Sequence, residues 1–392
     1  MSLNERVNYV LKSNILDFWV SNSVDHENGG FFGGIDKLGN GLDIDKCLIL
    51  NSRILWSFSK AYNYYKNNIY LDMADRAYNY LIDRFWDKKN GGFYWCVSNN
   101  GEVLDKSKEV YGQSFAIYGL CEYFIAKSLG EARDYALKTY SYLEEKALDK
   151  NNNGYFEIFN DNWEKDSKTR DSIIGLSYSK SNNTHLHLME SYTLLYSVCH
   201  EKKIENSLKN LVEIMTEKIM CENRLNFTLY LNEKWIPESS TISCGHEIEA
   251  AWLLRRALDT IGDNSYKEKF NSLIMKIIDN CYCSYLDGAV GERGMFNEID
   301  NGIVDKSKLW WVQAEACVGF YLGYEITKDR KYLEVVENIW CYIEEFVVDF
   351  KNGEWFYFGK DSVGAKDDLK AKDWKSFYHN LRCCIELLER MT

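Results

Sequence analysis

Proline is nearly absent from the chain, since of 392 residues only Pro237 is a proline. Because proline is costly inside helices, its scarcity suits a chain made mostly of helices. Long apolar runs are missing too, as no segment offers the roughly 20 uninterrupted apolar residues of a membrane span. The N-terminus, residues 1–6, lacks the basic and apolar regions of a secretion signal. We therefore expect a cytoplasmic protein with no membrane partner.

An excess of positive charge is missing as well. The formal net charge is −12 and the isoelectric point is about 5.2, so an acidic surface would repel nucleic acids and anionic membranes. Both are excluded as partners, whereas neutral ligands remain open. The 12 cysteines form no C-x-x-C motif, and only the pairs Cys281/Cys283 and Cys383/Cys384 are close in sequence. We expect the cysteines to be reduced and mostly buried.

A turn signature recurs along the chain, in which Asn-Gly or Asp-Gly precedes aromatic or apolar residues. Its first glycines are Gly29, Gly91, Gly154, Gly288 and Gly353. The intervals are 62, 63, 134 and 65 residues, so the long interval hides a degenerate member around residues 223–227. Glycine turns of this kind predict a short hairpin or bend, and they divide the chain into six units.

The residues between the turns have helical periodicity. In the first unit, Leu48, Ile54, Leu55 and Phe58 recur at helical spacing, and residues 70–85 predict a second helix before the next turn. Repeated helical hairpins of this length indicate a stacked or closed array. Six of them favour an all-α fold, an (α/α)6 barrel, over an open solenoid with polar caps. No linker or low-complexity tract interrupts the chain, so we expect one domain, residues 1–392.

Two of the six histidines share a spacing with a glutamate. His187 precedes Glu190 by three positions, and His246 precedes Glu249 by three, which on a helix puts imidazole and carboxylate on one face. Each carboxylate then either orients its imidazole or binds ligand hydroxyls. An imidazole titrates near neutral pH, so it suits a group that accepts a proton in one step and donates it in another. His379, near the C-terminus, is the third functional candidate.

The other histidines are expected to have no part in a site. His26 and His200 lie in polar surroundings, and His185 is turned about 200° away from His187 on a helix, which favours a hydrogen-bonded structural residue. A metal site is the rival interpretation of the histidine motifs. Neither the H-E-x-x-H zinc pattern nor the Glu-x-x-His order of di-iron bundles is present, because here His precedes Glu. We expect no metal and no cofactor.

Aromatic residues make up 15% of the chain and include 12 tryptophans. Trp310, Trp311 and Trp374 are either core residues or platforms on which the C–H face of a sugar packs. Arg53 lies among apolar residues, where a charge needs a function. Arg53, the three candidate histidines and residues 310–315 each fall in the first helix after a turn. If these helices line a barrel, the side chains converge on one mouth.

Four motifs in a fixed order carry a resemblance that spans essentially the whole chain. With residues 183–190, 245–249, 310–315 and 374–382, the sequence resembles the cellobiose 2-epimerases of the N-acylglucosamine 2-epimerase superfamily. The resemblance implies that His246 and His379 are the acid/base groups flanking C2 of the sugar and that His187 assists ring opening. The expected substrate-binding residues are Arg53, Tyr111, Asn183, Glu190, Glu249, Trp310, Trp311, Glu315 and Trp374.

The expected function is epimerisation at C2 of the reducing-end glucose of cellobiose and related β-1,4 disaccharides such as lactose. N-acylglucosamine 2-epimerase and mannose epimerase or isomerase are the alternatives on the same scaffold. A glycoside hydrolase needs two carboxylates across the cleft, where this chain has histidines. A non-catalytic sugar-binding protein would need the aromatic residues but not three histidines on the helices that line the barrel. We expect a monomer that binds a small disaccharide.

Overall fold

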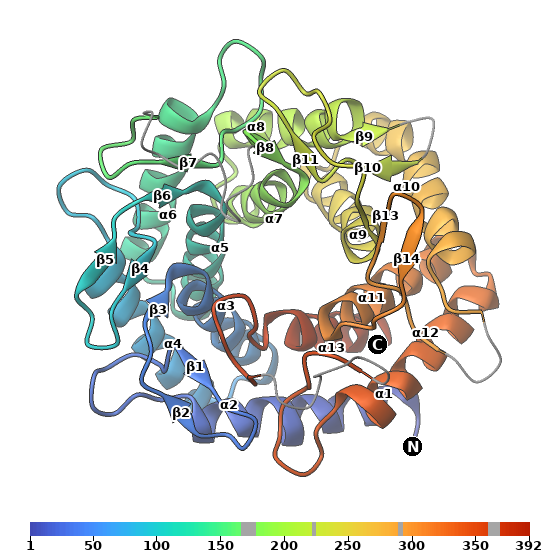
Figure 1. The fold of residues 1–392 in the computed structure, drawn as a ribbon, viewed down its shortest axis with the longest axis horizontal. Helices are drawn as coiled ribbons and strands as arrows, with labels where there is room; N and C mark the ends of the chain where they lie inside the picture. Colours follow the sequence, from blue (N-terminus) through green and yellow to red (C-terminus); the bar gives the residue numbers. More distant parts are fainter. Residues whose placement is uncertain (166–177, 222–224, 289–292, 360–368) are drawn as a thin grey trace.

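The helices form two concentric layers around a central axis (Figure 1). The computed structural model describes residues 1–165, 178–221, 225–288, 293–359 and 369–392. The inner layer consists of α3 (Leu48–Tyr65), α5 (Val110–Lys127), α7 (Asn182–Cys199), α9 (Cys244–Ile261), α11 (Trp310–Thr327) and α13 (Tyr378–Arg390). These are the helices that follow the predicted turns.

The outer layer alternates with the inner one along the chain, and most of its helices include a segment of wider, π-helical turns, labelled η. Its members are α1 (Leu3–Tyr9) with η1 (Val10–Leu16) and α2 (Asp17–Asn22), α4 (Asn68–Tyr80) with η2 (Leu81–Phe85), α6 (Gly130–Tyr142) with η3 (Leu143–Ala147), α8 (Lys202–Glu213) with η4 (Ile214–Ile219), α10 (Asn264–Ser284), and α12 (Arg330–Tyr342) with η5 (Ile343–Val347). Their alternation with the inner helices matches the predicted helical hairpins.

The inner helices contact one another in a closed ring, from α3 through α5, α7, α9, α11 and α13 back to α3. The N-terminal helix α1 packs on the C-terminal helix α13, so the two ends of the chain together supply the last hairpin. Small residues let inner helices approach closely. A Cβ on Gly119 would lie 2.8 Å from the main-chain oxygen of Ser52. The closed ring confirms the predicted (α/α)6 barrel and excludes the open solenoid.

Burial differs between the layers as the sequence patterns indicate. In α5 every residue from Val110 to Tyr123 is buried, because neighbours cover the helix on all sides. In α8 the buried residues Ile204, Leu208 and Leu211 form a single stripe, which is typical of an amphipathic outer helix. Among the described helices, none combines the length and apolar character needed to cross a membrane.

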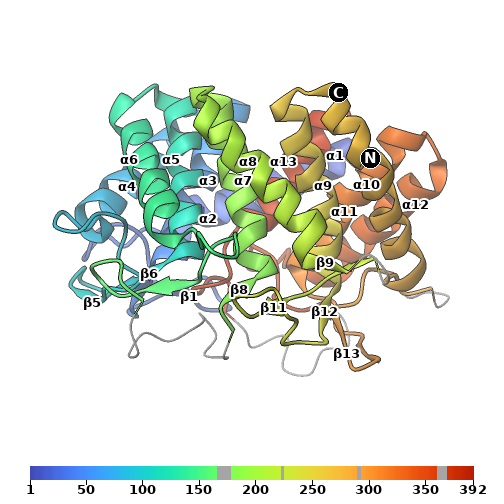
Figure 2. The ribbon, with the colours of Figure 1, turned by 90° about the horizontal axis from the view of Figure 1, so that it is seen from above.

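Short strands gather at one end of the barrel, beside the N-termini of the inner helices (Figure 2). They pair antiparallel as β1–β2, β3–β4–β5, β6–β7, β8–β11, β9–β10 and β12–β13–β14. Their bounds are β1 Gly34–Ile35, β2 Gly41–Leu42, β3 Lys46–Cys47, β4 Cys96–Val97, β5 Val103–Asp105, β6 Lys108–Glu109, β7 Ile158–Phe159, β8 Lys180–Ser181, β9 Met220–Cys221, β10 Asn226–Phe227, β11 Tyr230–Leu231, β12 Ile242–Ser243, β13 Glu298–Asp300 and β14 Ile303–Asp305.

The predicted turns are bends closed by a single antiparallel bridge, such as Trp86 to Phe93 and Leu148 to Tyr155. For the degenerate sixth member, residues 223 and 224 lie outside the described residues, and the flanking strands β9 and β10 form a hairpin. Residues 289 and 290 of the Gly288 turn also lie outside them. The bends therefore have the hairpin character that their glycines predict.

A repeated ion pair that sequence reasoning missed anchors five of these bends. In each, an aspartate that is buried, or half-buried in the case of Asp287, binds a lysine just before the next inner helix or, in the last pair, in the segment leading to α13, with N–O distances of 2.7–3.0 Å. The pairs are Asp25–Lys46, Asp87–Lys108, Asp149–Lys180, Asp287–Lys308 and Asp349–Lys370. Each pair fixes the end of an outer helix to the start of the following unit, at the mouth where the candidate site lies.

Candidate active site

A cavity of about 270 Å³ opens at the strand-bearing mouth of the barrel. Its lining includes four of the predicted site residues, Asn183, His246, Trp311 and Trp374, all of them half-buried. The remaining lining residues are Glu157, Tyr178, Ser181, Thr184, Leu229, Tyr230, Ser243, Asn297, Glu298 and Leu309. Three inner helices and the segment before α13 thus bring residues that are far apart in sequence to one cavity.

The three candidate histidines each have one ring nitrogen bound to a neighbour. His187 Nδ1 lies 2.9 Å from Glu190, as the three-residue spacing predicts. His246 Nδ1 instead lies 2.8 Å from the hydroxyl of Ser243, so the predicted contact with Glu249 is not formed. His379 Nδ1 lies 2.7 Å from Glu315 on α11. Since a carboxylate only accepts hydrogen bonds, the Nδ1 atoms of His187 and His379 donate, and their Nε2 atoms keep a lone pair.

Arg382 explains why Glu249 does not pair with His246. Its guanidinium binds three carboxylates at once, those of Glu190, Glu249 and Glu315, the last at 2.7 Å. All four side chains are buried. Arg382 occupies the same three-residue offset after His379 that Glu190 and Glu249 occupy after their histidines. This recurring offset was the signal in the sequence that could have identified Arg382, which we had given no role.

Burial and the guanidinium divide the carboxyl groups into two kinds. Burial alone raises the pKa of Glu190, but Arg382 and His187 together lower it below the ordinary value. Burial, reinforced by the neighbouring Glu315, raises the pKa of Glu249 well above it. Burial also raises the pKa of Glu315, against the opposing effect of Arg382. Glu190 is therefore held ionised, whereas burial opposes the ionisation of Glu249 and Glu315 and Arg382 favours it.

The same burial keeps the histidines neutral. It lowers the pKa of His187, against the opposing bond to Glu190, and lowers that of His246 to about 3 with a contribution from His187. Burial and the charges of Arg53 and Arg382 lower the pKa of His379. At neutral pH all three are proton acceptors rather than cations, which is the state that a general base requires.

Arg53 links Tyr111 on α5 to the segment that carries Trp374. Its guanidinium donates to the main-chain oxygen of Trp374 and to the hydroxyl of Tyr111, both at 2.9 Å. It lies over the rings of Phe115 and Tyr378 at 4.4 and 4.9 Å, which compensates for the loss of water around a cation. Arg53 therefore holds the segment that carries Trp374 in place beside the cavity.

The two adjacent tryptophans of α11 face different surroundings. The ring of Trp311 contacts both candidate bases, with centroids 4.9 Å from His246 and 5.6 Å from His379. Trp310 is 3% exposed and packs on Tyr357 at 4.5 Å. Only Trp311 reaches the cavity, whereas Trp310 belongs to the core behind it.

His185 occupies a structural position that recurs in the units. Its Nε2 accepts a hydrogen bond from the main-chain nitrogen of Tyr155 at 2.9 Å, and Nδ1 lies 2.7 Å from the main-chain oxygen of Ser181. Gln113, Glu247 and Gln313, at the same place in their helices, accept from main-chain nitrogens of the preceding turn. His185 thus fixes a turn, as expected. His26 and His200 are exposed.

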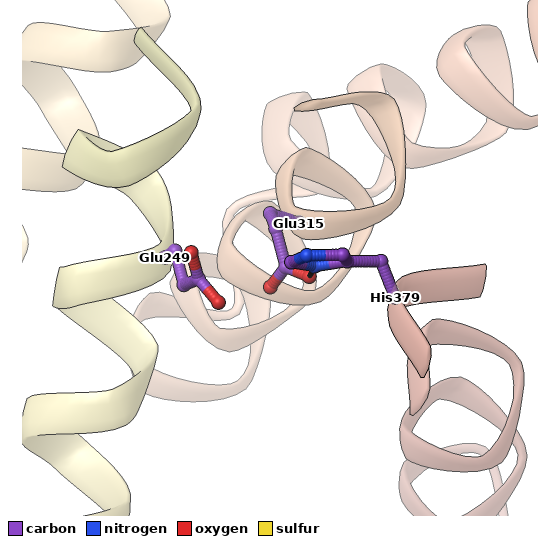
Figure 3. A group of neighbouring side chains, drawn as sticks. All are labelled: Glu249, Glu315 and His379. Atoms are coloured by element: carbon purple, nitrogen blue, oxygen red, sulfur yellow. Dashed lines mark hydrogen bonds and ion pairs between the residues drawn. The ribbon is translucent and has the colours of Figure 1, made fainter. Parts of the chain in front are cut away.

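One group of side chains has the composition of a metal site. Glu249, Glu315 and His379 point toward one another from α9, α11 and α13 (Figure 3), and their ligand atoms lie within 4.8 Å of one another. The guanidinium of Arg382 already binds both carboxylates of this group. A cation at the same place would be repelled by that charge, so the arrangement suits proton transfer better than metal binding.

Comparisons with known proteins agree over nearly the whole chain. A family described as N-acylglucosamine 2-epimerase (GlcNAc 2-epimerase) matches residues 30–383. The chain is 37% identical to the cellobiose 2-epimerase of Bacteroides fragilis over 390 residues, 98% of each chain. It is 37% identical to that of Dictyoglomus turgidum over 386 residues, 97% of each. The solved cellobiose 2-epimerase from Bacillus thermoamylovorans has a TM-score of 0.93 at 35% identity and covers 99% of both chains.

Proposed function

The chain belongs to the N-acylglucosamine 2-epimerase family, and from this premise we propose that it inverts C2 of the reducing-end glucose of cellobiose and related β-1,4 disaccharides such as lactose. The product is the corresponding mannose epimer. The observation that carries the proposal is the placement of two neutral imidazoles, His246 and His379, against the one indole of Trp311. A sugar ring that packs on this indole has both imidazoles within reach.

The reaction begins with ring opening, which yields the free aldehyde and which His187 assists. One of His246 and His379 then removes the C2 proton. The electron pair of the C–H bond forms the C1–C2 double bond of an enediolate, and negative charge develops on O1. Arg53, whose guanidinium binds the main-chain oxygen of Trp374 and the hydroxyl of Tyr111, stabilises that charge.

Rotation about C2–C3 presents the opposite face of the enediolate to the other histidine. That histidine takes a proton from water onto its free ring nitrogen and donates it to C2, where the C1–C2 electron pair forms the new C–H bond while the charge on O1 returns to the C1–O1 double bond of the aldehyde. The first imidazole then releases the original C2 proton to water, so both imidazoles are neutral again and no net proton is gained or lost. Glu315 keeps the His379 ring oriented through Nδ1, and the Ser243 hydroxyl serves either tautomer of His246 because it both donates and accepts.

Incubation of the protein with cellobiose, followed by separation of the products and their masses, tests the proposal. We expect a product with the mass of the substrate and no free glucose. A hydrolase would instead release glucose in proportion to enzyme. Hydrolysis also requires an acid and a base or nucleophile carboxylate, whereas the carboxyl groups that adjoin the candidate histidines, Glu190, Glu249 and Glu315, are all bound to Arg382.

Exhaustive chelation is expected to leave the rate of epimerisation unchanged, because the proposed chemistry needs only proton transfer and Arg382 supplies positive charge among the carboxylates. The measurement compares the rate before and after treatment with EDTA and removal of the chelate. Loss of activity that one added divalent ion restores would show that Glu249, Glu315 and His379 bind a metal.

Removing the indole of Trp311 or Trp374 is expected to weaken sugar binding more than it destabilises the fold. Each platform contributes about 1 kcal/mol to binding, so Trp311→Ala and Trp374→Ala should raise KM about fivefold at a nearly unchanged melting temperature. Trp310→Ala is the matched control. Since Trp310 is a core residue, its loss should lower the free energy of unfolding by about 3–5 kcal/mol. Normal KM with early melting in all three variants would place every one of these rings in the core.

The compartment and the assembly state follow as further parts of the proposal. All 12 cysteines are free thiols, which suits a reducing compartment, so we infer a cytoplasmic enzyme. We expect it to act as a monomer. Fractionation of cells and sedimentation of the purified protein test these two expectations separately.

A further inference from the structure

Glu157 is a buried carboxyl group that lines the cavity and has no part in the reaction described above. It lies between the Gly154 turn and β7, and its side chain is 1% exposed. Its main-chain oxygen accepts from the nitrogen of Val110, at the start of α5, at 2.9 Å. This bond fixes the backbone of Glu157 and so places its side chain in the wall of the cavity.

Two hydroxyl groups at the start of α7 donate to this carboxylate. Ser181 Oγ lies 3.0 Å from one oxygen and Thr184 Oγ1 lies 2.7 Å from the other. Ser181 is also the N-cap of α7, because its Oγ accepts from the main-chain nitrogen of Thr184 at 3.1 Å. Glu157 therefore binds both side chains that shape the first turn of this helix.

The first turn of α7 carries groups that the proposed reaction uses. Asn183 lies between the two hydroxyl-bearing residues and lines the cavity, and its side chain lies close enough to Tyr111 to influence the pKa of that hydroxyl. His187 follows one turn later and is oriented by Glu190. A rotation or fraying of this turn would displace the sugar-binding amide and the ring-opening imidazole together.

We propose that Glu157 is a positioning residue. Its carboxylate accepts a hydrogen bond from each of the two hydroxyls and thereby holds the first turn of α7 in the position that sugar binding requires. This inference rests on the proposed function. A carboxylate has two acceptor oxygens, so both hydroxyls donate to it at once. An amide or a protonated carboxyl group has one acceptor and one donor group, so one of the two hydroxyls would have to rotate and accept instead. The observed arrangement, with both hydroxyls donating, requires the carboxylate.

Burial raises the pKa of Glu157 to about 7, against the opposing bonds from Thr184 and Ser181. The catalytic imidazoles have lowered pKa values, so they do not change charge in this range. The other titratable groups around Glu157 are Tyr178, Tyr230, His246 and Glu298 in the cavity wall and Glu109 on the paired strand β6. A fall in kcat/KM as the pH drops through 7 is therefore the expected mark of Glu157.

The test compares Glu157→Gln with wild-type protein in the epimerisation of cellobiose across pH 5.5–8.5. Because hydrogen bonds to a charged group are the strong ones, we expect kcat/KM to fall about tenfold or more at pH 8 and to lose its dependence on pH near 7. Glu164→Gln, at an exposed glutamate in the turn that follows β7, is the matched control and should behave as wild type. Unchanged kcat/KM and an unchanged pH profile in Glu157→Gln would overturn the inference.

A double-mutant cycle with Thr184→Val tests whether Glu157 acts through α7. Thr184→Val removes one of the two bonds and leaves the carboxyl group, so the double variant should lose little more than Glu157→Gln alone. Multiplying effects would show that Glu157 acts by another route. If Glu157→Gln does not fold, Thr184→Val decides the matter, since it should still lower kcat/KM, and wild-type kinetics would reject the inference. An inactive wild-type protein would instead refute the proposed function itself.

Discussion

Alanine at His246 or His379 is expected to abolish epimerisation of cellobiose while leaving the protein folded. Each variant lacks one of the two proton carriers, a loss that typically costs about 10² to 10⁴ in rate. The remaining imidazole still reaches its own face of the sugar. Each single variant should therefore exchange the C2 proton of one epimer with deuterium oxide without inverting it, and the two variants should select opposite epimers.

His200→Ala serves as the control for this pair, because His200 is exposed and lies outside the cavity. It should epimerise cellobiose at the wild-type rate. Proton NMR of each epimer in deuterium oxide measures both inversion and exchange. Full epimerisation by His246→Ala or His379→Ala would reject the assignment of that residue and leave the class of reaction standing.

Methionine at Arg382 is expected to cause a large loss of stability. The substitution leaves the buried carboxyl groups of Glu190, Glu249 and Glu315 without their shared cation. Breaking a buried ion pair in this way typically lowers the free energy of unfolding by about 3–5 kcal/mol. Denaturant unfolding, compared with wild type at one pH, measures the loss.

The deficit of Arg382→Met should grow as the pH rises. In wild type, Arg382 lowers the pKa of Glu190, so this carboxylate contributes stability that is present above its ordinary pKa and is lost on acidification. In the variant the pKa values of the three groups rise instead, and stability is lost as the pH rises through them. Arg256→Met, which removes a partly exposed arginine paired with Glu386, is the control and should cost less. An equal loss of unfolding free energy in the two variants at every pH would contradict a special role for Arg382 among the three buried carboxyl groups.

The fold could be predicted because its repeat is marked by turns whose residues are recognisable in the sequence. The glycines at intervals of 62, 63 and 65 residues mark bends whose backbone conformation only a few residues adopt, as at Gly91 with φ of 74°. The helical periodicity between the bends predicts two helices in each unit, and these form the inner and outer layers. The pairing of α1 with α13 is a contact between chain ends, so no local pattern encoded it.

The site was predictable where one helix supplies both partners. His187 and Glu190 share a face of α7, and their contact follows from spacing alone. The partner of Glu249 is Arg382 on another helix, and competition between distant groups decides that choice. Adjacent tryptophans on a helix differ in direction by about 100°, so only the rotation of α11 shows that Trp311 faces the cavity.

Turnover of cellobiose by the wild-type protein in deuterium oxide tests the central claim most directly. A C2 proton that passes through imidazoles exchanging with water must be replaced by solvent deuterium. We therefore expect one deuterium at C2 of the mannose epimer, measured by mass and by the loss of the C2 proton signal. Retention of the original hydrogen at C2 during inversion would contradict proton transfer by His246 and His379 and would indicate hydride or carbon-skeleton chemistry instead.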